Sequence, residues 1–305
     1  MYTRKTVVLA GASGFIGGYF RTRFGQDGWE VRTIGRTRTG TGADTVCWGD
    51  DAGLTRVLDG ADLLVNLAGR SVNCRYSQRN RAEILTSRVS TTAELGRAVG
   101  HCSAPPATWL NASTGTIYRH AEDAQQSEHD GEPGDGFSVD VARAWESALA
   151  RAETPLTRKV PLRISIVLGP GGGVMRPLAN LARLGLGGHM GSGRQKFSWV
   201  HVEDLYRGVL FVHQRTDITG PVNVASPDVV DNRELMQLIR RAYGVPIGLP
   251  TPAWLLELGA VLTRTETELV LKSRWVQPQK LLNAGFAFTH PELGSALQDI
   301  TGRKA

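Results

Sequence analysis

A short apolar run that meets three evenly spaced glycines constrains this chain more than any other feature. Residues 6–17 read TVVLAGASGFIG, so that Gly11, Gly14 and Gly17 follow one another at intervals of three. The apolar run before the first glycine is typical of a buried parallel strand, and apolar residues after Gly14 recur at helical spacing. The sequence therefore predicts a strand, a tight turn and a helix at the start of the chain.

The spacing of these glycines fits a turn that holds the phosphates of a dinucleotide. Gly11 allows the tight turn, Gly14 lets the backbone approach a pyrophosphate, and Gly17 lets the helix pack on the sheet. Ala12 and Ser13 lie between the glycines and are assigned to the same site. A purely structural turn is the alternative, but the pattern stands between a first strand and an amphipathic helix, which is the context that dinucleotide binding requires.

The end of the second expected strand bears on which dinucleotide would bind. Residues 30–40 read EVRTIGRTRTG, with Arg36 and Arg38 where an NAD site usually offers a carboxylate to the ribose hydroxyls. A guanidinium cannot accept a hydrogen bond from a diol, but it pairs well with a phosphate. NADP(H) is therefore expected in preference to NAD(H), with Arg36 as the first candidate and Arg38 as the second; solvated surface charges are the alternative.

Strand-like and helix-like segments alternate through the first half of the chain. This order predicts an α/β fold with a Rossmann-type, doubly wound parallel sheet. The Rossmann domain is expected at 1–170 with a returning segment near 200–225, and a small, mostly helical C-terminal lobe at 171–305. Strands are expected at 6–10, 30–35, 45–48, 62–68, 108–113 and 161–168, and long helices at 78–99 and 137–152.

Composition excludes several other classes of protein. No apolar run approaches the ~20 residues that cross a bilayer, so no membrane association is expected. The net charge of +6 comes from scattered arginines without a basic run, which argues against nucleic-acid binding. Cys47, Cys74 and Cys102 are odd in number and unpaired in spacing, as expected for reduced thiols in the cytoplasm.

Several longer segments resemble those of a known family. Besides the glycine turn, they include NLAG at 66–69, RISIVLGP at 163–170, LTSRVSTTAEL, STGTIY, RAWESA and LGLGGHMGSGRQKFSWVHVEDL. Together they resemble an extended, atypical short-chain dehydrogenase/reductase. More narrowly, the chain is similar to the NAD(P)-binding, epimerase-like subgroup that carries a C-terminal domain of unknown function.

The resemblance implies cofactor and substrate roles for residues at the strand ends. Ser113 and Thr114 fall where the superfamily places a hydroxyl that hydrogen-bonds the reacting carbonyl. The implied cofactor contacts are Phe15 and Ile16 at the pyrophosphate, Leu67, Ala68 and Gly69 at the ribose, Asp50 at the adenine, and Val167 and Leu168 at the nicotinamide.

The proton-transfer pair of the wider superfamily is missing. That pair is a Tyr and a Lys four residues apart on one helix face, often followed by a Glu. Glu146 fits the Glu, so that the Tyr position falls on Ser138 and the Lys position on Ala142. Either Tyr118 has taken over as the acid or no such proton transfer occurs; without a nearby Lys its pKa stays near ~10, and packing is the competing role.

The substrate segment also departs from the nucleotide-sugar epimerases. The arginine with which they hold a diphosphate aligns with Phe197, although Arg194 and Lys196 are close by. An ordinary UDP-sugar epimerase is therefore not expected. Phe197 and Trp199 suggest an apolar substrate wall, with core packing as the alternative.

No metal site is expected. His201 and Asp204 alone are too few ligands for a closed site, and a strand-end histidine with a helix-start acid accounts for both residues. The sequence thus leaves two functions open. The first is an NADP(H)-dependent oxidoreductase or epimerase-like enzyme acting on a small molecule, and the second is an NADP(H)-binding protein without catalysis.

Overall fold

A parallel sheet forms the centre of the molecule. The computed structural model describes residues 4–37, 45–252 and 272–302. The strand order across the sheet is β10-β6-β5-β4-β1-β2-β3, and every pairing in it is parallel. The strands are β1 (Thr6–Ala10), β2 (Glu30–Gly35), β3 (Thr45–Cys47), β4 (Leu63–Asn66), β5 (Thr108–Thr114), β6 (Arg158–Ile164) and β10 (Val222–Val224). The Rossmann-type α/β fold predicted from the sequence is confirmed.

The order of the strands places a ligand crevice at the ends of β1 and β4. These two strands are neighbours in the sheet, yet the chain continues from β1 to β2 on one side and from β4 to β5 on the other. Such a switch point leaves a gap outside the carboxyl ends of the strands, where α/β sheets bind their ligands. The glycine turn follows β1 directly and therefore lies at this gap.

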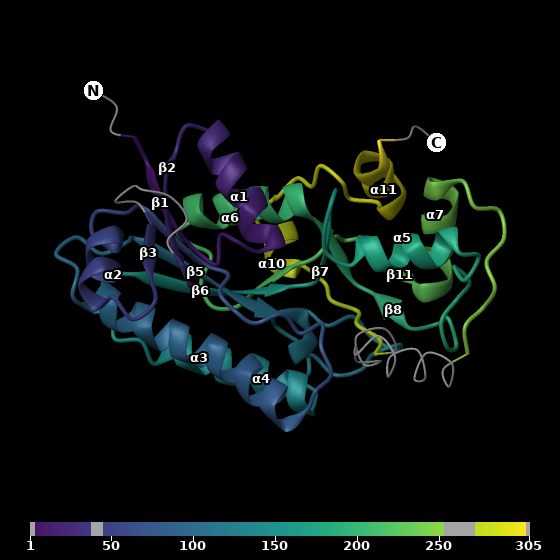
Figure 1. Cartoon of the computed structure of the whole chain (residues 1–305), viewed down its shortest axis with the longest axis horizontal. Helices are drawn as coiled ribbons and strands as arrows, with labels where there is room; N and C mark the ends of the chain where they lie inside the picture. The colour runs from purple at the N-terminus through teal and green to yellow at the C-terminus, as the bar shows by residue number, and fades with distance from the viewer. Residues whose placement is uncertain (1–3, 38–44, 253–271, 303–305) are drawn as a thin grey trace.

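Helices cover both faces of the sheet. Successive side chains of β1 point to opposite faces, and they are apolar on both. Val7 and Leu9 pack in one core cluster, and Val8 and Ala10 pack in another. One face carries α1 (Phe15–Gln26) and α6 (Val202–Gln214), and the other carries α2 (Asp51–Leu58), α3 (Gln78–Gly100) and α4 (Phe137–Ala150) (Figure 1). None of the helices in the described ranges is long and apolar enough to span a membrane.

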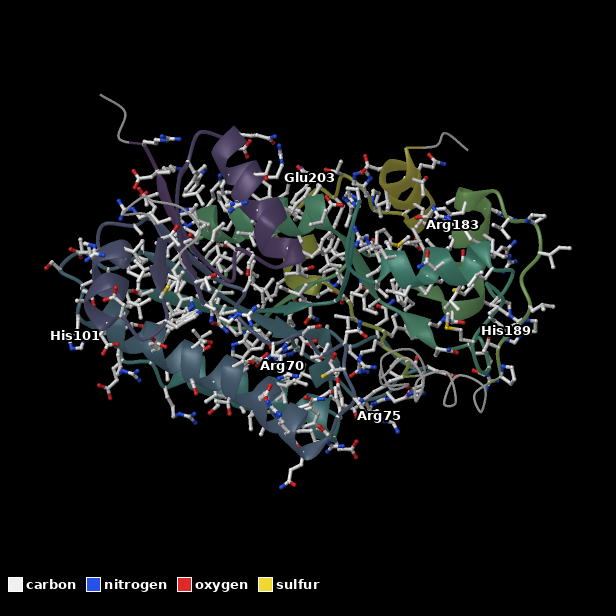
Figure 2. The ribbon with its side chains drawn as sticks, in the orientation of Figure 1. Arg70, Arg75, His101, Arg183, His189 and Glu203 are labelled. Atoms are coloured by element: carbon white, nitrogen blue, oxygen red, sulfur yellow. The ribbon has the colours of Figure 1, made fainter. Side chains whose placement is uncertain are left out.

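A charged contact joins α1 to α6. Glu203, in the first turn of α6, accepts hydrogen bonds from the Tyr19 hydroxyl at 2.6 Å and from the Arg23 guanidinium at 3.0 and 3.1 Å. The side chain of Glu203 lies beside α1 in Figure 2. Because α1 begins at the glycine turn, this contact fixes the helix whose first residues face the crevice.

One expected strand is two strands in the structure. The run predicted at 161–168 breaks at Ser165, whose backbone N–H donates to the Val224 carbonyl at 3.0 Å. After the break, β7 (Ile166–Leu168) pairs with β9 (Trp199–His201) and leaves the main sheet. The partner strand lies more than thirty residues away along the chain, so local apolar periodicity could not reveal the break.

A second group of elements packs at one end of the sheet (Figure 1). Its helices α5 (Met175–Arg183), α7 (Asn232–Tyr243) and α11 (Leu293–Thr301) share a core with Trp199, and β8 (Lys196–Phe197) pairs antiparallel with β11 (Val230–Asp231). The short helix α10 (Gln279–Asn283) instead contacts β10 of the main sheet. The described C-terminal elements are thus mainly helices, accompanied by the two small strand pairs β7–β9 and β8–β11.

Candidate functional site

Backbone packing requires two of the three glycines in the turn, Gly11 and Gly17, whether or not a ligand is bound. A Cβ on Gly11, which has a φ of +87°, would lie 2.8 Å from the carbonyl carbon of Leu67. A Cβ on Gly17 would lie 2.3 Å from the carbonyl oxygen of Gly11. Any side chain at these positions would therefore separate α1 or the end of β4 from the turn.

Gly14 differs, because the fold has room for a side chain at this position. It is the N-cap of α1 with φ −78°, and a Cβ there would meet only the Gly11 carbonyl oxygen, at an ordinary 3.6 Å. No side chain caps α1, and its first turn holds no acidic residue. The exposed N–H groups and the helix dipole favour an anion here. These residues fit a dinucleotide pyrophosphate.

A second glycine-rich turn covers the start of α1. A Cβ on Gly172 would lie 2.3 Å from Cδ2 of the Phe15 ring, and a Cβ on Gly169 or Gly173 would lie 3.0 or 3.2 Å from that ring. Phe15 is thus held between the two glycine turns, while Ile16 packs against the core under the sheet. The arrangement brings residues 169–173 to the expected pyrophosphate position.

The segment after β4 is held by buried amides. The Oδ1 atom of Asn66 accepts from the Ala68 backbone N–H at 3.0 Å, and its Nδ2 atom donates to Oδ1 of Asn111 on β5 at 2.7 Å. Both asparagines have no exposed surface. Leu67, Ala68 and Gly69 are therefore fixed beside Gly11 at the switch point, where the resemblance places the ribose.

Arg88 is a cation near this segment that the sequence analysis did not identify. A Cβ on Gly69 would lie 3.1 Å from the Arg88 Cζ atom. The Nη1 atom of Arg88 donates to the carbonyls of Arg70 and Ile84, and its guanidinium lies over the Trp145 ring at 5.0 Å. Burial lowers the pKa of Arg88 to about 10, so it still carries its charge at neutral pH. Its place in the middle of a helix gave no signal in the sequence.

The candidates for adenosine recognition are less closely tied to the turn. Arg36 follows β2 and is exposed, while Arg38 lies outside the described residues. Asp50 is the N-cap of α2 and accepts from the Gly53 backbone N–H at 2.9 Å. Capping accounts for this carboxylate, and a contact between Asp50 and an adenine stays a prediction.

At the expected nicotinamide position, Val167 and Leu168 differ in burial. The carbonyl oxygen of Val167 lies 3.2 Å from where a Gly173 Cβ would be, so β7 borders the second glycine turn. The Leu168 side chain is 0% exposed and packs with Met175 and Trp199. Only the backbone of Leu168 is therefore placed to contact a cofactor.

The two hydroxyl candidates at the end of β5 have separate environments. Ser113 is 4% exposed, and its hydroxyl donates to Oε1 of Glu146 at 2.7 Å. Arg163 holds that carboxylate through two hydrogen bonds, at 2.9 and 3.0 Å. Thr114 lines a cavity, and its hydroxyl bonds that of Thr116 at 2.9 Å. Of the two candidates, Thr114 is the one that faces open space.

Tyr118 is a core residue, which favours packing, the competing role that the sequence left open for it. Its side chain is 2% exposed, its hydroxyl donates to Oδ1 of Asn223 at 2.8 Å, and it accepts from Nη1 of Arg163 at 2.9 Å. Burial raises the pKa of Tyr118, against the opposing effect of Arg163. Its burial and its two hydrogen bonds favour packing over proton donation, and a catalytic role for this phenol stays a prediction. The packing interpretation holds for this residue.

The lysine position of the missing pair is part of the same packing, whereas Ser138 at the tyrosine position is half-buried. Ala142 is 0% exposed and shares a small apolar cluster with Tyr118, Val139 and Val276. A lysine there would need its ammonium buried among these side chains, which is costly. The cation of this region comes instead from Arg163 on β6, and Glu146 neutralises it.

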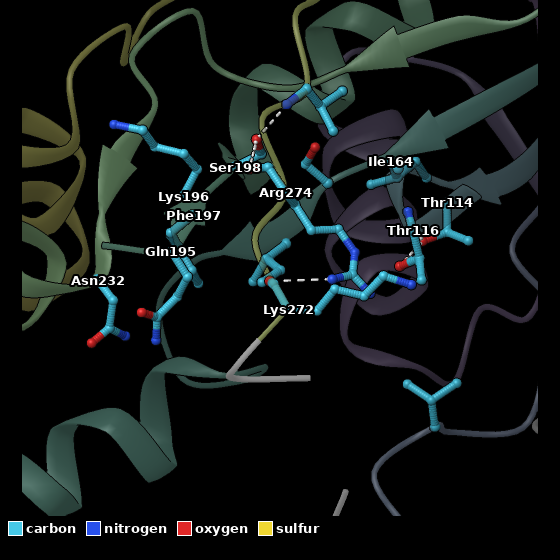
Figure 3. Close-up of a pocket in the computed structure, with 15 residues that line it drawn as sticks. Thr114, Thr116, Ile164, Gln195, Lys196, Phe197, Ser198, Asn232, Lys272 and Arg274 are labelled. Atoms are coloured by element: carbon cyan, nitrogen blue, oxygen red, sulfur yellow. Dashed lines mark hydrogen bonds between the residues drawn. The ribbon is translucent and has the colours of Figure 1, made fainter. Parts of the chain in front are cut away.

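A cavity of about 190 Å³ opens beside Thr114 (Figure 3). Its apolar wall includes Phe197, as the sequence suggested, whereas Trp199 is fully buried and belongs to the core. The Lys196 ammonium lies over the Trp275 ring at 5.0 Å. Arg194 is exposed and is not among the described lining residues.

His201 stands in a cluster that the sequence did not predict. It ends β9 and caps α6, with Asp204 in the first helical turn, as expected. Its Nε2 atom, however, lies 3.3 Å from Oδ2 of Asp299, and its ring centroid lies 4.1 Å from that of His290. The three side chains are close enough to share a metal ion. His201 Nδ1 accepts from the Glu203 backbone N–H at 3.3 Å, which leaves the proton on Nε2, facing the carboxylate, rather than a lone pair for a metal.

Sequence comparison decides the family. A model described as the NAD dependent epimerase/dehydratase family matches residues 7–225. This chain belongs to that family. A second model, a domain of unknown function (DUF1731), matches residues 251–300, so both parts of the resemblance found in the sequence are confirmed.

Relatives of this epimerase-family chain span its whole length. The epimerase family protein SDR39U1 of Bos taurus is 34% identical over 301 residues, which covers 96% of this chain and 99% of the relative. The epimerase family protein MT2273 of Mycobacterium tuberculosis is 32% identical, covering 97% and 98%. A crystal structure of human SDR39U1 with NADPH has a TM-score of 0.88 at 30% identity, covering 98% of this chain and all of that one.

The two glycine positions give a matched pair of variants. Gly17→Ala should destabilise the fold by about 3 kcal/mol, because its Cβ meets backbone. Gly14→Ala should cost no more than about 1 kcal/mol, yet lower NADPH affinity at least about tenfold by filling the pyrophosphate approach. Urea denaturation and calorimetric titration with NADPH measure the two effects; undiminished NADPH binding by Gly14→Ala would contradict the assignment.

His201 should make stability depend on acidity. Burial, and then the nearby His290, lower the pKa of His201 to about 4, against ~6.5 in an unfolded chain. The unfolded chain binds more protons between these values, so this contribution is present above about pH 6.5 and is lost as pH falls toward 4, by about 3 kcal/mol in total. His201→Asn keeps an N-cap and should flatten the pH dependence of unfolding in this window; equal slopes for both proteins would refute the prediction.

Proposed function

We propose that this protein is an NADP(H)-dependent oxidoreductase or epimerase-like enzyme that acts on a small molecule. The proposal rests on one observation: the start of α1 at Gly14, beside the switch point of a parallel sheet, has no side-chain cap and no acidic residue in its first turn. A dinucleotide pyrophosphate satisfies the N–H groups of such a turn, and family membership supports the same cofactor class.

NADP(H) is the proposed form of the cofactor. Arg36 follows β2 and is exposed, so its guanidinium is available to a 2′-phosphate. The crystal structure of human SDR39U1, which matches 98% of this chain, was determined with NADPH. Both observations favour the phosphorylated dinucleotide over NAD(H).

The chain's own groups define what chemistry is available beside the cofactor. Bound NADPH would supply a hydride to a carbonyl carbon, while the oxygen takes up a proton, giving an alcohol and NADP⁺. Thr114 and Thr116 line the cavity, and the Thr114 hydroxyl donates to that of Thr116, which can polarise the carbonyl oxygen by hydrogen bonding. A threonine hydroxyl that gives up its proton must regain one, so this pair can only relay a proton, and the net proton would come from solvent.

Two further assignments accompany the proposal. We place the NADP(H)-binding domain at 1–170 with the returning segment near 200–225, which contains β10, and the substrate lobe at 171–305. We also propose a cytoplasmic location, which the free thiols of Cys47, Cys74 and Cys102 support.

A binding protein without catalysis is the second candidate. It is favoured by Ser138 and Ala142, which stand where the proton-transfer pair would be, and by the burial of Tyr118. Such a protein would bind NADP(H) with the same residues and respond to the cofactor rather than turn it over.

A single-residue change tests the cofactor. Arg36→Ala should weaken NADPH binding by about 10- to 100-fold, because a charge-assisted hydrogen bond to phosphate is lost, and should leave NADH affinity within about twofold. Arg38→Ala serves as the comparison, since it is the other candidate. If neither variant changes the ratio of NADPH to NADH affinity, the guanidinium assignment is wrong.

Turnover separates the two functions. We expect NADPH, followed by its absorbance, to be oxidised when the protein meets a panel of small aldehydes and ketones, and Thr116→Val to slow that oxidation without weakening NADPH binding. Tight NADPH binding with no oxidation across the panel would favour the binding protein instead.

A further inference from the structure

Large apolar side chains are exposed together on two loops of the C-terminal lobe. Leu184 is 73% exposed and Leu186 40%, after α5, while Ile247 is 71% exposed and Leu249 61%, after α7. Elsewhere in the described part of the chain, only Leu85 and Leu156 are large apolar side chains with comparable exposure. The loop after α7 runs along the right-hand edge of Figure 1, away from the main sheet.

The two loops lie side by side and are hydrogen-bonded to each other. The Leu249 N–H donates to the Gly185 carbonyl at 2.8 Å, and the Gly188 N–H donates to the Leu249 carbonyl at 3.0 Å. A Cβ on Gly188 would lie 2.4 Å from the Leu249 carbonyl carbon, so the loops approach as closely as glycine permits. Leu184, Leu186, Ile247 and Leu249 therefore form one surface feature, the apolar tip.

Much of the backbone at the apolar tip needs no water as a hydrogen-bond partner. The Val245 N–H donates to the Arg240 carbonyl at 2.8 Å, and both backbone groups of Leu249 are bonded to the neighbouring loop. Pro246 and Pro250 carry no N–H. Because unpaired N–H groups are what makes loops costly to place in an apolar medium, this backbone is suited to one.

The charged residues within the two loops and at their starts are all cations. Residues 183–189 and 240–252 contain Arg183, Arg240 and Arg241, but no Asp or Glu. The Arg183 guanidinium lies over the Tyr243 ring at 4.8 Å, and Nη1 of Arg240 donates to the Gly187 carbonyl at 2.6 Å. Arg183 and Arg241 are exposed. The apolar tip is thus flanked by positive charge.

This combination favours an anionic partner. Exposed apolar patches beside charged residues mark interaction surfaces. A symmetric contact between two copies of this chain would bring the same arginines against each other, which like-charge repulsion opposes. Leucine and isoleucine beside arginine, on loops at an edge of the molecule, instead match the boundary between the headgroups and acyl chains of an anionic bilayer.

We propose that the apolar tip docks this protein on an anionic lipid bilayer, with Leu184, Ile247 and Leu249 in the boundary region and Arg183 and Arg241 at the lipid phosphates. The lack of a long apolar run predicts no membrane association from the sequence, but these side chains come together only in the fold. The inference goes beyond the proposed function, because it involves neither the cofactor nor the cavity.

Vesicle flotation with the full chain tests the proposal. The probes are vesicles of phosphatidylcholine alone and vesicles in which about a third of the lipid is phosphatidylglycerol. We expect at least about tenfold stronger partition onto the anionic vesicles at low salt, and a loss of most of this difference at about 1 M salt, where charges are screened.

Variants locate the contact. Ile247→Ser and Leu249→Ser should each lower partition at least about fivefold, since each removes an aliphatic side chain from the boundary region. Leu156→Ser is the matched control, because Leu156 is 76% exposed two residues before β6 and lies outside the apolar tip. Arg241→Gln should lower partition about fivefold on the anionic vesicles only. The unfolding midpoint and NADPH affinity of each variant show whether it is folded.

Three results would overturn the inference. The first is no partition onto anionic vesicles, and the second is a loss of partition in Leu156→Ser as large as that in Ile247→Ser. The third is a wild-type dimer in sedimentation that Ile247→Ser dissociates while vesicles are not bound, which would make the apolar tip a contact between copies. Since NADPH binding and oxidation are measured without lipid, failure of the proposed function leaves this inference standing, and the reverse also holds.

Discussion

The contact between Gly17 and the carbonyl oxygen of Gly11 sets the geometry of the whole nucleotide side. A Cβ at Gly17 would lie 2.3 Å from that oxygen, so α1 can only approach β1 this closely with glycine in place. The approach aims the first turn of α1 at the switch point, and the Glu203 contacts with Tyr19 and Arg23 then hold the helix to α6. The assigned pyrophosphate contacts follow from that placement.

A different kind of chemistry occupies the place of the usual proton-transfer pair. Ala142 and Tyr118 pack together in a small apolar cluster, and the guanidinium of Arg163 donates hydrogen bonds to Glu146 and to the Tyr118 hydroxyl. Burial opposes the charge of Arg163, but its hydrogen bonds to Glu146 outweigh this and raise the pKa of the guanidinium. These hydrogen bonds join β5, β6 and α4. The hydroxyls of Thr114 and Thr116, just after Ser113, line the cavity instead.

Local patterns in the sequence predicted most of the sheet, because the central strands β1 and β4 are almost entirely apolar and the other strands lie between clear helix and turn signals. They placed β1 and β2 at their observed bounds and the ends of α3 within a residue. They missed the break at Ser165, which depends on pairing with a distant strand, and the cluster around His201, whose other members lie about ninety residues further on. The sequence also did not show that Lys272 and Arg274 line the cavity, because that follows only from their place on an extended segment beside β8.

Residues 272–276 form one wall of the cavity beside Thr114, so the nucleotide turn and the cavity draw on segments far apart in the chain. The nucleotide turn is complete within the first thirty-seven residues, whereas two of the lining residues of the cavity, Lys272 and Arg274, come from the last thirty-four. During synthesis, the turn and most of the sheet emerge from the ribosome well before this wall exists. In evolution, exchange of the C-terminal segment alone could alter ligand preference while the nucleotide half stays intact.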